Sequence, residues 1–217
     1  MVISLKNKSN PLGKKTMSLS NHQLNALAKK MGYEITNIVF KDELLMMKPE
    51  FNDKGYCCYV INMENEEDDQ GRPNDGSHWV ALYIKKLPTG QTEPLYLDSY
   101  GCPPPKDVTD FAGTKHIPYN KKDVQGILSS ICGWYCLAFL YMLTSFPHRT
   151  NDTYVDASNF LEVFDDMNEV VDLHKNEWKL KHFFEDTSSG AARKPIVPNL
   201  HKVTDLSEEE KKNLGET

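Results

Sequence analysis

Apolar residues follow two patterns along this chain, and each pattern predicts a different kind of element. Short apolar runs bounded by turn residues are typical of strands, and they occur at residues 34–40, 56–63, 77–84 and 94–100. A shorter strand is expected at 115–119. Apolar residues three and four positions apart are typical of helices that bury one face. The mixture of helices with antiparallel hairpin strands predicts an α+β fold.

The first predicted helix begins after Ser20 and ends at Gly32. Ser20 and Gln23 have the spacing of a capping box, and glycine is favoured just beyond a helix end. Its apolar stripe consists of Leu24, Leu27, Ala28 and Met31. Further helical segments are expected as a single turn at 41–47, after the prolines at 103–105, and as amphipathic helices at roughly 155–168 and 174–185.

A different pattern is found in "ILSSICGWYCLAFLYMLTSF", residues 127–146, where small polar residues give way to an almost unbroken apolar run. The run from Trp134 to Leu143 is much shorter than the roughly 20 residues that span a bilayer. It predicts a helix buried on all sides, with no membrane contact. Cys132 and Gly133 lie where the loop becomes the helix.

The remaining segments suggest one domain with two extensions. Residues 1–19 are interpreted as a loose leader, 20–186 as the folded domain, and 187–217 as a polar tail outside the core. Net charge is −6 for 217 residues, which does not favour general nucleic-acid binding. Five cysteines, no C-x-x-C pair and no secretory signal predict a reducing compartment without disulfides or a metal site.

The hairpin made by 77–84 and 94–100 brings two polar residues together. If its turn centres on residues 89 and 90, Val80 lies opposite Asp98, and His78 becomes a diagonal neighbour of Asp98. An imidazole–carboxylate contact is then expected. The alternative is that both are polar residues at strand ends on a solvated edge.

Cys132 is a candidate nucleophile because a helix N-terminus stabilises a thiolate and offers unpaired N–H groups to an oxyanion. His78 would activate the thiol, and an acid would orient the imidazole. Gln125, seven residues before Cys132, is a candidate oxyanion donor. The alternative for Cys132 is a packed structural thiol, a description that suits Cys136 better.

These residues resemble the adenovirus-type (adenain-like) maturation proteases and their relatives in virophages, polinton-type elements and large DNA viruses. The wider clan includes proteases that remove ubiquitin-like modifiers. The resemblance covers about residues 24–142, and its motifs are "GSHWVALYI", "LYLDSYG", and a glutamine followed by "ICGWYC". It implies a papain-like cysteine protease core in permuted order, with a central buried helix on a mixed, largely antiparallel sheet.

The resemblance also implies roles at matching positions: Cys132 as nucleophile, His78 as general base, Asp98 as orienting acid and Gln125 as oxyanion donor. Trp79 fills the family's aromatic position beside the histidine, and Gly133 follows the nucleophile. Asp98 stands where the adenoviral enzyme has glutamate, although aspartate is usual elsewhere in the clan.

The function that the resemblance implies is processing of capsid or other virion precursor proteins, in the virion and the host cytoplasm, with no secretion. An activating peptide is a possible partner. The acidic net charge does not favour the DNA cofactor of the adenoviral enzyme, and no other cofactor is expected. The alternatives are a protease that removes ubiquitin-like modifiers, an acyltransferase of the same clan, and a non-catalytic binding module.

Overall fold

The computed structural model describes residues 18–74, 76–126, 129–146, 150, 152–165 and 170–188. Four strands form a single sheet in the order β1-β2-β3-β4. Their bounds are Asn37–Phe40 for β1, Tyr56–Asn62 for β2, Trp79–Lys86 for β3 and Thr92–Leu97 for β4. β1 lies parallel to β2, whereas β2, β3 and β4 are antiparallel. The expected α+β class and the mixed, largely antiparallel sheet are confirmed.

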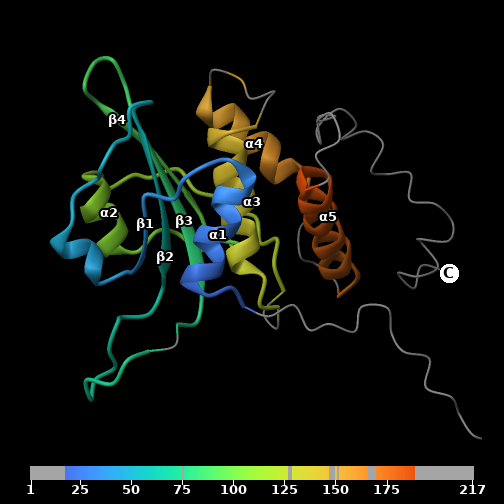
Figure 1. The fold of residues 1–217 in the computed structure, drawn as a ribbon, viewed down its shortest axis with the longest axis horizontal. Coiled ribbons are helices and arrows are strands. Elements are labelled where there is room, and N and C mark those ends of the chain that lie inside the picture. The colour runs from blue at the N-terminus through green and yellow to red at the C-terminus, as the bar shows by residue number, and fades with distance from the viewer. Residues whose placement is uncertain are drawn as a thin grey trace, which may run out of the picture.

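Helices lie on both faces of this sheet (Figure 1). Their bounds are Asn21–Met31 for α1, Glu43–Met46 for the 3₁₀ turn η1, Lys106–Ala112 for α2, Cys132–Thr144 for α3, Thr153–Glu162 for α4 and Val170–Ser188 for α5. One face carries η1 and α2, and the other carries α3 with α1, α4 and α5 around it.

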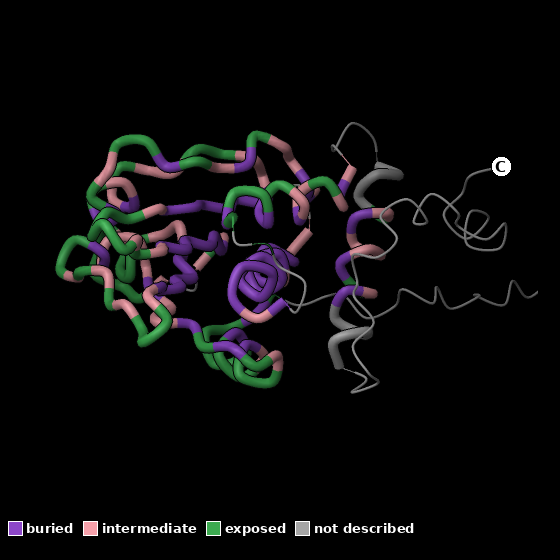
Figure 2. Tube along the Cα trace, turned by 90° about the horizontal axis from the view of Figure 1, so that it is seen from above, coloured by how far each residue is buried: buried purple, intermediate pink, exposed green. Residues whose placement is uncertain are grey.

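The central helix α3 is buried along almost its whole length, as its apolar sequence predicts. In Figure 2 it is seen nearly end-on, and its trace is in the buried colour around most of its circumference. Its side chains pack on the sheet face formed by residues such as Cys58, Ala81 and Leu97. This packing fixes the N-terminal end of α3 relative to β3 and β4.

The N-terminal helix α1 has the capping box that its sequence predicts. The Ser20 hydroxyl accepts from the Gln23 amide, the Gln23 side chain accepts from the Ser20 amide, and Gly32 ends the helix at a φ of 85°. Leu19, assigned above to the leader, is buried, and its carbonyl accepts a 2.9 Å hydrogen bond from the Trp79 indole. The core therefore includes at least this residue before the helix.

Two expected elements differ from the structure. The segment 115–119 forms only an isolated bridge, between Tyr119 and Tyr96, because Pro118 has no N–H to donate to a ladder. Helix α4 ends at Glu162, because the Asn176 side chain binds both the N–H and the carbonyl of Asp165 just beyond it.

Some predictions fall outside the described residues: most of the leader and the tail from residue 189. Among the helices that the structure does describe, none has the length and apolarity needed to cross a bilayer.

Candidate active site

The β3–β4 hairpin brings His78 and Asp98 together at its open end. The observed register pairs Ala81 with Leu97, which places Val80 opposite Asp98 as the sequence predicts. His78 lies just before β3 and Asp98 just after β4. The His78 Nε2 is 2.8 Å from the Asp98 Oδ1, and Asp98 is only 3% exposed. The expected imidazole–carboxylate contact is therefore present.

The Asp98 carboxylate and backbone are held by further hydrogen bonds. The Tyr100 amide donates to the same Oδ1 atom at 2.8 Å. The Asn120 side chain binds the backbone of Asp98 on both sides, accepting from its N–H at 3.0 Å and donating to its carbonyl. This double contact acts like a strand partner at the point where β4 ends, and it fixes the carboxylate facing His78.

Cys132 is the first residue of α3 and is buried. The Trp79 amide N–H lies 3.5 Å from the Cys132 Sγ, so the thiol meets the chain directly after His78. No side chain caps the helix, and within the described residues the amides of Cys132 and Gly133 have no acceptor. Free N–H groups and the helix dipole therefore face the region around the thiol.

Gly133 permits the close approach of α3 to the sheet. A Cβ atom at this position would lie 3.2 Å from the Leu24 side chain and 3.4 Å from those of Leu19 and Trp79. Close packing at this position thus explains why a glycine follows the candidate nucleophile. Trp79 is 5% exposed and packs against this point, as expected for the aromatic position beside the histidine.

The second ring nitrogen of His78, Nδ1, is the only buried side-chain nitrogen or oxygen in the described part of the chain that lacks a hydrogen-bond partner. Burial lowers the pKa of His78, but its hydrogen bond to Asp98 and the interaction with Asp98 and Cys132 as negative charges outweigh burial and raise the pKa from 6.5 to about 9. Since Nε2 binds Asp98, Nδ1 is the nitrogen left for the Cys132 thiol. Nδ1 makes no hydrogen bond to the thiol in this structure, and such contacts are often long or poorly aligned in catalytic pairs without substrate.

Gln125 is fully buried, and both ends of its side-chain amide are hydrogen-bonded within the protein. Its Oε1 accepts from the Ser99 hydroxyl at 2.8 Å, and its Nε2 donates to the Ser129 carbonyl at 2.8 Å and to the Tyr100 hydroxyl at 3.2 Å. Gln125 therefore contacts the site indirectly, through its hydrogen bond to the Tyr100 hydroxyl.

Tyr100 was not among the residues selected from the sequence. Its ring stacks on the His78 imidazole with centroids 4.5 Å apart and an interplanar angle of 28°. Its position two residues after Asp98, within "LYLDSYG", was the available signal. Asn120 and Ser99 were also missed, since they act through backbone and side-chain contacts that no sequence spacing reveals.

The other cysteines differ from Cys132 in their surroundings. Burial raises the pKa of Cys136 and Cys58 well above its usual value and that of Cys57 to about 12, with nearby charge contributing. Cys102 is exposed and lies outside the His78 contacts. All five thiols are free, and no group of residues suited to a metal ion exists within the described ranges.

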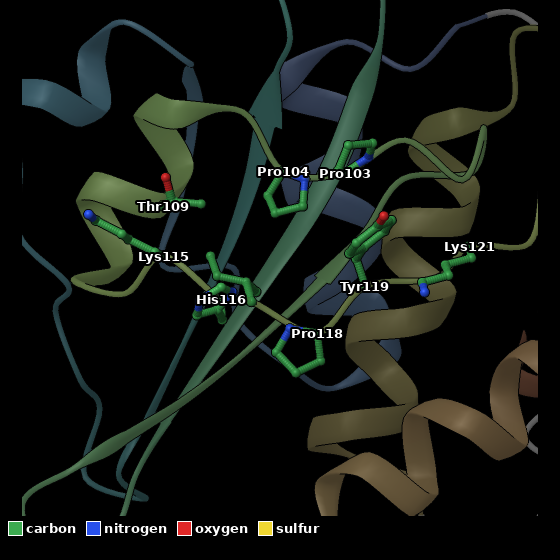
Figure 3. Close-up of a pocket in the computed structure, with 9 residues that line it drawn as sticks. Pro103, Pro104, Thr109, Lys115, His116, Pro118, Tyr119 and Lys121 are labelled. Atoms are coloured by element: carbon green, nitrogen blue, oxygen red, sulfur yellow. The ribbon is translucent and has the colours of Figure 1, made fainter.

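A pocket of about 440 Å³ lies between α2, the loop just before it and the segment 115–121 (Figure 3). Its lining residues include three prolines, Tyr119 and the cationic side chains of Lys115 and Lys121. None of the four candidate catalytic residues lines it.

Comparison with known proteins adds no family assignment: no protein-family model matches the chain, and no curated protein matches its sequence.

Proposed function

We propose that this chain is a cysteine endopeptidase that uses Cys132, His78 and Asp98. The observation that carries the proposal is the placement of His78, with Nε2 on a buried carboxylate and the otherwise unpartnered Nδ1 left for a thiol at a helix N-terminus. Cys132 attacks the scissile carbonyl as the thiolate, and His78 carries the proton to the leaving amine. Asp98 holds the ring and stabilises its charged form.

The rest of the proposal follows the adenain-type resemblance. The core is papain-like in permuted order, with the chain order His78, Asp98, Cys132. The substrates are capsid or other virion precursor proteins cut near small residues, and the enzyme acts in the virion and the host cytoplasm. The support for these substrates and this location is the resemblance of the motifs "GSHWVALYI", "LYLDSYG" and "ICGWYC" to those of the adenain-type proteases. The free amides at the start of α3, with Gln125 behind Tyr100, are suited to an oxyanion.

Digestion of a peptide library tests the proposal. Purified protein is incubated with a proteome-derived peptide library, and new termini are identified by mass spectrometry. Wild-type protein should produce cuts with small residues, glycine among them, on one side of the bond. Cys132→Ala should lower cleavage by more than about 100-fold, because a covalent nucleophile cannot be replaced by its neighbours.

Cys136→Ala is the matched control. It removes a thiol one helical turn away, inside the apolar run, and should retain cleavage at some cost in packing. Cuts that persist in Cys132→Ala would assign the nucleophile elsewhere. Cleavage confined to a Gly-Gly terminus of a ubiquitin-like modifier would favour the deconjugating alternative.

A further inference from the structure

Tyr100 lies between the candidate catalytic groups and contacts three of them. Its ring covers the His78 imidazole, its amide donates to Asp98, and its hydroxyl accepts from Gln125. No other residue in the described part of the chain makes this set of contacts. A packing role alone would not explain why the Tyr100 hydroxyl accepts a hydrogen bond from the buried Gln125 amide.

The two hydrogens of the Gln125 amide are both used. The carbonyl of Ser129 must face Nε2 because a carbonyl only accepts, and this fixes which way the amide points. The second hydrogen is directed to the Tyr100 hydroxyl. Gln125 therefore has no hydrogen left for a substrate oxygen in this arrangement.

The hydroxyl hydrogen of Tyr100 remains available. Among the described residues it has no acceptor, while the oxygen that carries it receives the hydrogen bond from Gln125. A hydroxyl that accepts one hydrogen bond becomes a stronger donor. Burial raises the pKa of Tyr100, and charge on Cys132 and Asp98 raises it further, so the hydroxyl keeps its hydrogen at neutral pH.

We propose that Tyr100 is a catalytic residue that donates its hydroxyl hydrogen bond to the oxyanion, with Gln125 as the positioning residue behind it. The inference rests on the proposed role of Cys132 as nucleophile. In the acylation step the Cys132 thiolate forms a bond to the carbonyl carbon, and the carbonyl π electrons move to oxygen. Tyr100 and the first amides of α3 bind that charge. The carbonyl then re-forms, and the leaving amine departs with the bonding pair and with the proton that His78 carries.

Two reactions of Cys132 separate this role from others. Acylation by p-nitrophenyl acetate passes through an oxyanion, whereas alkylation by iodoacetamide does not. Both reactions need the thiolate, and neither needs a peptide substrate. Each rate is measured at Cys132 by mass spectrometry, with Cys132→Ala as the blank. Tyr100→Phe removes the hydroxyl and keeps the ring on His78.

Tyr100→Phe should lower the acylation rate by about 100-fold, as loss of one oxyanion donor does, and leave the alkylation rate unchanged. Tyr154→Phe, which removes an exposed hydroxyl on α4, should change neither rate. Equal losses in both reactions would make Tyr100 a residue that only orients His78, and unchanged acylation would remove it from the oxyanion site. Either result overturns the inference. Failure of wild-type protein to cut any peptide, with the acylation result as expected, would overturn the peptidase assignment alone.

Discussion

At the scale of single residues, the charge on His78 decides what the site can do. Its carboxylate partner is 3% exposed and accepts from both the imidazole and the Tyr100 amide, so the acceptor is fixed before substrate arrives. A fixed carboxylate favours the imidazolium form. The ring is thus prepared to stand beside a thiolate, and the stacked Tyr100 ring shields it from water.

The pKa of His78 predicts how stability depends on pH. The folded pKa of about 9 is above the unfolded value of 6.5, so this proton stabilises the fold fully below about pH 6.5. The contribution decreases as pH rises and is lost once pH passes about 9. The melting-temperature difference between wild-type protein and His78→Gln, measured from pH 6 to pH 10, should therefore shrink with rising pH.

Asp98→Asn serves as the control for that titration. This variant removes a charge that raises the pKa of His78. The melting-temperature difference between Asp98→Asn and the double variant His78→Gln, Asp98→Asn should therefore depend much less on pH. A wild-type difference that stays constant from pH 6 to pH 10 would show that His78 is not protonated in the folded state at neutral pH.

At the scale of elements, the loop before α3 is held from both sides of the molecule. The Ser99 carbonyl accepts from the amides of Val124 and Gln125 on the strand side. On the helix side, the Asn176 amide donates to the Val124 carbonyl at 3.1 Å, and the Ser129 hydroxyl donates to Glu177 at 2.8 Å. Helix α5 thus takes part in positioning the residues that precede Cys132.

Asn176→Ala should lower stability and, through the loop, catalysis. Asn176 is fully buried and its amide also binds both backbone groups of Asp165, so the variant leaves buried polar groups without partners. The expected cost is about 1–3 kcal/mol, which corresponds to a fall of several degrees in melting temperature for a domain of this size. Calorimetry measures it. His174→Ala, on the exposed side of the same helix, should change little; an equal loss there would contradict the role of the buried contacts.

The elements that the sequence predicts well are those set by local pattern. The capping box at Ser20 and the hairpin register need only neighbouring residues, and the register alone was enough to bring His78 to Asp98. The environment of Gln125 could not be predicted, because its partners Ser99, Tyr100 and Ser129 come from a turn and a loop whose paths are set by tertiary packing. The strand expected at 115–119 is wrong for a different reason: Pro118 has no N–H to donate, so only the bridge between Tyr119 and Tyr96 forms.

At the scale of the whole molecule, two apolar clusters lie on opposite faces of the sheet. The cluster around α3 is the larger, and it includes Leu180 and Phe183 from α5. Among the described residues, its members extend from Leu19 to Phe183. The segment from residue 189 is rich in polar and charged residues and is interrupted by prolines.

A pair of truncations separates the contributions of α5 and the tail. A chain that ends at Ser188 should keep its melting temperature and its cleavage rate, since a polar segment buries too little to offset its ordering entropy. A chain that ends at Asp165 loses Leu180 and Phe183 from the core and both helix contacts to the active-site loop. It should melt many degrees lower or become insoluble, because each buried large side chain alone contributes about 1.5–3 kcal/mol. If the Ser188 truncation also melts several degrees lower, residues 189–217 contribute to the core, with Ile196, Val197 and Leu200 among the apolar side chains available to do so.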